Sequence, residues 1–96
     1  MSREIKTEHF FCTRASATWY HNEKKRLNPM YNLIRFTFLG ERGVLCFYLV
    51  TTRTLMTVIC EAYDYLGMLF RYSINKLGYE PVDRGYVLTA IELIEF

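Results

Sequence analysis

The sequence is poor in proline, and its apolar runs are short. Only two residues are proline, while 51% are hydrophobic and 17% aromatic, which excludes the disordered chains that lack aromatic residues. The longest uncharged apolar run, Val44–Thr52, is well short of the ~18–20 residues that a membrane-spanning helix requires. The first residues alternate charged and apolar side chains, unlike the continuous apolar stretch of a signal peptide. We therefore expect a globular, cytoplasmic chain that does not enter a membrane.

Cysteine is also scarce. The three cysteines, Cys12, Cys46 and Cys60, are odd in number, whereas an oxidised secreted domain of this size usually carries a denser, even set. Each lies in an apolar or aromatic stretch, so we expect them to be reduced and mostly buried. His9 and His21 could join Cys12 as metal ligands, but a structural zinc site normally has a second close pair of ligands. The sequence therefore predicts no metal and no cofactor.

The motifs of common enzyme classes are missing as well. There is no Gly-x-Ser-x-Gly turn and no glycine-rich phosphate loop with a lysine. Glu61 and Asp64 fall on the polar side of a predicted helix, where two carboxyl groups could share a proton. Exposed carboxylates on a helix more often serve solubility. The sequence therefore favours a protein that is not an enzyme.

Several segments have the composition and pattern of β-strands: Glu4–Thr13, Tyr31–Leu39, Val44–Thr51 and Tyr86–Phe96. The second and third are joined by Gly40-Glu41-Arg42-Gly43, whose glycines suit positive φ at both ends of a tight turn. Val44–Thr51 is apolar on both faces, as expected for a buried central strand. A β-hairpin is therefore predicted at the centre of the sheet.

The region before this hairpin carries a weaker pattern. Ala15–His21 could form a short additional strand after a turn at Ala15–Ser16. The polar and charged stretch Asn22–Pro29 then reads as a connection that ends at the turn signal Asn28–Pro29.

One long helix is predicted over Thr54–Leu77. Thr52 or Thr54 could form its N-cap, and Gly78 with Pro81 marks its end. With these elements, residues 1–96 are expected to form a single α+β domain. It has a mainly antiparallel sheet of four or five strands, in the order β-(β)-β-β-α-β, with the long helix packed across one face.

The predicted helix has more apolar surface than one face of a small sheet can cover. On a helical projection, Val58, Tyr65 and Tyr72 form one flank, with Met68 beside them nearer the polar side. Methionine and tyrosine tolerate exposure and pack well when bound. We expect this flank to mediate self-association or docking, unless the sheet curls around the helix and covers both flanks.

A second candidate surface combines aromatic and basic residues. It consists of Trp19, Tyr20, Lys24, Lys25 and Arg26. Proteins that bind nucleic acids place cations against the phosphates and aromatic faces against the bases. A three-residue basic run is more often a solvated loop, however, and the net charge of +2 is low for a dedicated nucleic-acid-binding protein.

The leading functional prediction is a small non-enzymatic protein that binds other proteins. It is expected to be a homodimer or higher oligomer that acts as an inhibitor or adaptor by occupying a surface of a host macromolecular complex. Small motif-free proteins of this kind are frequent among phage and mobile-element accessory proteins that block host nucleases or defence systems. The alternative is a nucleic-acid-binding module that uses the aromatic and basic segment.

Overall fold

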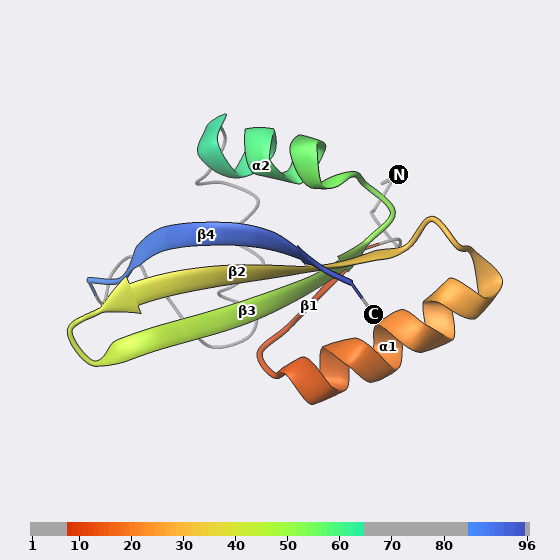
Figure 1. Ribbon diagram of the computed structural model, residues 1–96, viewed down its shortest axis with the longest axis horizontal. Coiled ribbons are helices and arrows are strands. Elements are labelled where there is room, and N and C mark those ends of the chain that lie inside the picture. Colours follow the sequence, from red (N-terminus) through yellow and green to blue (C-terminus); the bar gives the residue numbers. More distant parts are fainter. Residues whose placement is uncertain (1–7, 65–84, 96) are drawn as a thin grey trace, which may run out of the picture.

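The computed structural model describes residues 8–64 and 85–95 (Figure 1). The elements in chain order are β1 (Glu8–Phe11), α1 (Arg14–Leu27), β2 (Asn32–Gly40), β3 (Gly43–Thr51), α2 (Leu55–Asp64) and β4 (Val87–Ile94). Four antiparallel strands form one sheet, in the order β1-β3-β2-β4. The predicted α+β class with a mainly antiparallel sheet is confirmed.

The central hairpin lies where the sequence predicts it. Gly40 pairs with Gly43, which has a φ of 111°. No other residue type among those described adopts positive φ, so Glu41 and Arg42 cannot form the mirror-image turns that require it. Gly40 is required for a different reason: a Cβ placed there would lie 2.6 Å from the Tyr86 ring. Only Gly43 therefore uses the conformational freedom of glycine in this turn.

The prediction for the segment between β1 and β2 is wrong. Ala15–His21 is not a strand and Asn22–Pro29 is not an irregular connection, because α1 spans Arg14–Leu27. The Thr13 side chain caps this helix by accepting a hydrogen bond from the Ser16 amide at 3.3 Å. Glu, Lys, Arg and Leu, which make up most of its second half, are all good helix formers. A charged run that resembles a loop is here the exposed side of a helix.

The two helices pack on opposite faces of the sheet (Figure 1). On one face, α2 contributes Val58 to a core built from the following buried residues of β2 and β3: Ile34, Phe36, Phe38, Phe47 and Leu49. On the other face, α1 contributes Ala17 to a smaller core, whose further buried members are Tyr31, Leu33, Tyr48 and Val50. Alternate residues of the same strands thus serve two cores, which explains why β3 is apolar on both faces.

Helix α2 begins where one of the two proposed caps predicts. The Thr54 hydroxyl accepts a hydrogen bond from the Thr57 amide at 3.2 Å, and the Thr54 carbonyl accepts one from the Val58 amide at 3.1 Å. Thr54 is therefore the N-cap, and Thr52 is not. The remainder of the predicted helix, with its end at Gly78 and Pro81, lies outside the described residues.

Candidate functional site

The aromatic and basic residues predicted to form a loop surface are distributed around α1. Successive helical residues are rotated by about 100°, so Trp19 and Arg26, seven residues apart, point in nearly the same direction. This direction is away from the sheet, because Ala17 and His21 are the buried residues of the helix. Trp19 is 65% exposed. We call this side, with Trp19, Arg26 and the adjacent Leu27, the outer face of α1.

Tyr20 and Lys24 occupy a different side of the helix, next to β1. The Tyr20 ring lies 5.2 Å from the rings of His9 and Phe11, which are themselves 5.1 Å apart. The Lys24 ammonium lies 5.4 Å from the Tyr20 ring centre, within the range of a cation–π contact. Because Tyr20 already packs against two rings and a cation, only Trp19 of the predicted aromatic pair extends freely from the surface.

The last turn of α1 concentrates positive charge. Lys24, Lys25 and Arg26 all lie in this turn, where cations interact favourably with the helix dipole. Arg26 also bonds to Glu23 at 3.0 Å, but both side chains are well exposed, and exposed ion pairs contribute only about 0–1 kcal/mol. The turn therefore remains basic overall, and Arg26 is its cation on the same side of the helix as Trp19.

His21 anchors the inner side of α1 to the loop before β2. Its Nε2 lies 3.3 Å from the Tyr31 carbonyl oxygen. Since a carbonyl can only accept a hydrogen bond, Nε2 carries the proton of the neutral ring. Burial lowers the pKa of His21 below its ordinary value of 6.5, and the Lys25 charge lowers this pKa further. The hydrogen bonds to Tyr31 and Asn22 oppose the shift only in part.

This lowered pKa makes folding stability depend on pH. Above pH 6.5 the imidazole is neutral in both states, whereas below it the unfolded chain takes up a proton that the folded state resists. The free energy of unfolding is therefore expected to fall as the pH drops from about 7 through the lowered pKa. Urea titrations at a series of pH values measure this slope, which should flatten in His21→Gln. An equal slope in wild type and His21→Gln would contradict the assignment.

Within the described part of α2, the predicted interface flank faces the sheet and not the solvent. Val58 lies in the core and is only 3% exposed. The opposite flank, with Met56 at 68% exposure and an exposed Cys60, faces away from the sheet. Tyr65, Met68 and Tyr72 lie outside the described residues. An interface on that flank remains a prediction, and Val58 is not accessible to contribute to it.

The sequence did not reveal an uncovered apolar region of the sheet. Leu39 pairs with Val44 on one side and with Val87 on the other, so these residues form one row across β3, β2 and β4. They are 52%, 65% and 64% exposed, respectively. The row lies on the α1 face, near the β2–β3 turn, while α1 lies under the opposite end of the sheet (Figure 1). The pairing of Leu39 with Val44 could have been predicted from the hairpin turn. The position of Val87 beside Leu39 could not, because it depends on the place of β4 in the sheet.

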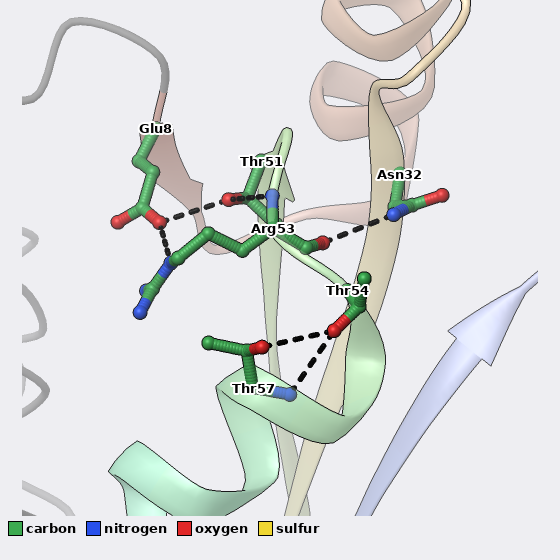
Figure 2. A network of polar contacts seen from close by, with 6 residues as sticks. All are labelled: Glu8, Asn32, Thr51, Arg53, Thr54 and Thr57. Atoms are coloured by element: carbon green, nitrogen blue, oxygen red, sulfur yellow. Dashed lines mark hydrogen bonds and ion pairs between the residues drawn. The ribbon is translucent and has the colours of Figure 1, made fainter.

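A polar network fixes the connection between β3 and α2, as Figure 2 shows. The Glu8 carboxylate accepts hydrogen bonds from the Thr51 hydroxyl, at 2.8 Å, and from the Arg53 guanidinium. Thr51 also accepts a bond from the Arg53 amide, and the Asn32 side chain donates to the Arg53 carbonyl, each at 3.0 Å. Because β1, β2 and β3 all take part, we interpret this network as a structural clamp.

Two further predictions can be compared with the described residues. All three cysteines are free, but Cys12 and Cys60 are exposed and only Cys46 is half-buried, so the expectation that they are mostly buried is wrong. Within residues 8–64 and 85–95 there is no cluster of His, Cys, Asp or Glu that could hold a metal ion. None of the helices described there is both long enough and apolar enough to cross a membrane.

Comparisons of the chain with protein-family models, with curated proteins and with solved structures find no match. Function is therefore inferred from the chemistry of the two exposed surfaces, the outer face of α1 and the apolar row of the sheet.

Proposed function

We propose that this chain is a non-enzymatic binding protein that docks the outer face of α1 on a protein partner. The observation that carries the proposal is the exposure of Trp19 and Leu27, at 65% and 79%, beside a basic helix turn. Tryptophan is highly buried on average in folded proteins. Tryptophan and arginine are also the residues most enriched among those that dominate binding energy at protein interfaces.

The basic residues in the last turn of α1 indicate the chemistry of the partner. Among the described residues, only one of the three basic residues in this turn has an acidic neighbour at bonding distance. The turn therefore attracts an acidic surface and accelerates association with it. The expected partner therefore offers an apolar pocket for the indole ring with acidic residues around it. Occupying such a surface would act sterically, as an inhibitor or adaptor of a larger complex does.

Affinity capture with matched variants tests this proposal. The tagged protein captures proteins from extracts of its native host, and mass spectrometry identifies them. Trp19→Ala is expected to weaken binding of the captured protein at least tenfold, as the loss of a dominant interface residue does. Met56→Ala, which removes an equally exposed apolar side chain from α2, should leave binding unchanged. Equal affinity for wild type and Trp19→Ala would refute the role of the outer face.

A nucleic-acid partner is the second candidate, because an exposed indole on a helix whose last turn carries three cations also suits stacking on a base and contact with phosphates. The two candidates respond differently to salt and nuclease. Binding to nucleic acid would disappear when the extract is treated with nuclease, and would decrease steeply as the salt concentration rises. Reversing the charges of Lys24, Lys25 and Arg26 to glutamate would abolish it. Capture that survives nuclease treatment favours the protein partner.

A further inference from the structure

The apolar row of the sheet is an organised surface and not a scatter of exposed side chains. Single exposed apolar residues are normal on a protein surface and need no explanation. Leu39, Val44 and Val87, however, are direct neighbours in the strand register, and each is more than half exposed. The row continues across three strands on one face of the sheet.

The next residues along these strands have smaller side chains, and we refer to this row as the trough. Thr37 pairs with Cys46 and with Ala90, so a row of small, half-buried side chains lies directly behind the apolar row. Thr37 and Cys46 lie 3.9 Å apart through their oxygen and sulfur atoms. A row of large apolar side chains on a facing surface could therefore pack into this trough. We call the apolar row and the trough together the open face.

An ion pair borders the open face on the side toward α1. Arg35 and Glu92 are opposite each other in the register, and their side chains are joined at 2.9 Å. Counting the described residues, this border thus carries one charge of each sign and has no net charge. A twofold axis brings the same patch of two molecules together, which a neutral patch permits. The outer face of α1 would instead bring the cations of two basic turns together.

The open face is small for an interface between two copies. It spans three strands about 4.8 Å apart and five residues rising roughly 3.3 Å each, which gives a footprint of a few hundred Å². A stable interface buries about 800 Å² per partner. We therefore expect a weak contact, and a dissociation constant of about 1 μM to 1 mM is the range to test.

From these observations we propose that the open face is a self-association surface, on which a second copy of this chain packs sheet to sheet about a twofold axis. The apolar row of each copy lies over the trough of the other. This proposal is independent of the proposed function, because the open face and the outer face of α1 share no residues.

Sedimentation equilibrium between about 10 μM and 1 mM tests the proposal. The wild-type protein is expected to shift from one chain to two over this range. Val44→Lys should remain monomeric throughout, because it removes an apolar contact and places a like charge on each copy. Leu27→Lys makes the same chemical change at a side chain that is also largely exposed, on α1, and should dimerise like the wild type. Circular dichroism confirms that both variants are folded.

The natural cysteines provide a second measurement. Labelling of Cys46, which lies in the trough, should slow as the protein concentration rises, whereas labelling of Cys60 on α2 should not change. The proposal is overturned if the wild type stays monomeric at 1 mM, or if Val44→Lys dimerises normally. Partner capture by Val44→Lys, assayed separately, tests the function of α1, so the two ideas fail independently.

Discussion

Replacing Phe47 with alanine is expected to remove a large share of the free energy of unfolding. Phe47 is fully buried in β3, directly opposite Phe36, and its ring meets the edge of Phe38 at a centroid distance of 6.0 Å. Truncating a buried phenylalanine to alanine costs about 3–5 kcal/mol, through lost transfer free energy and the cavity left behind. Domains of this size are stable by only about 5–15 kcal/mol in total. Urea denaturation followed by circular dichroism measures the difference.

Val44→Ala provides the matched control on the same strand. Val44 is three residues from Phe47, but it points to the opposite face and is mostly exposed. At micromolar concentration its truncation should change the free energy of unfolding by no more than about 0.5 kcal/mol. Phe47→Leu, which retains most of the apolar volume, should fall between the two. If Phe47→Ala and Val44→Ala were equally stable, the core between the sheet and α2 would be misassigned.

The sequence predicts those parts of the fold that depend on local patterns of residues. The β2–β3 hairpin follows from two apolar runs and a turn with Gly43 at the position of positive φ. Helix α1 also had a local signal, in the Thr13 cap and the four-residue spacing of Ala17 and His21. However, its aromatic residues have the pattern of a strand, and its charged residues have that of a loop. The helix was therefore not predicted.

The orientation of α2 could not be read from the sequence. Met56 and Val58 are both apolar, and both lie on flanks of the same helix, yet one is 68% and the other 3% exposed. Which flank meets the sheet depends on how the chain leaves β3, and this exit is fixed by contacts with distant residues of β1 and β2. The same limit applies to the open face, because Val87 joins Leu39 only through the strand order of the folded sheet.

Glu8 supplies the contact from β1, so removing its carboxylate is expected to destabilise the fold. In Glu8→Ala, the fully buried Thr51 loses the acceptor of its hydroxyl, and the partly buried Arg53 loses its ion pair with Glu8. A buried polar group left without its partner costs about 1–3 kcal/mol. The free energy of unfolding should fall by that amount, as measured by urea denaturation.

The ion pair on α1 provides the comparison that isolates the effect of burial. Glu23 also binds an arginine, but its side chain is 47% exposed, against 18% for Glu8. Glu23→Ala should therefore cost less than about 1 kcal/mol. A double-mutant cycle that combines Glu8→Ala with Thr51→Val should show a coupling of about 0.5–3 kcal/mol, because each variant disrupts the same bond. Additive effects, or equal costs at Glu8 and Glu23, would mean that the network does not act as a clamp. The exit of the chain from β3 would then be held by apolar packing and by the hydrogen bonds of Asn32 and Thr51 to the Arg53 backbone.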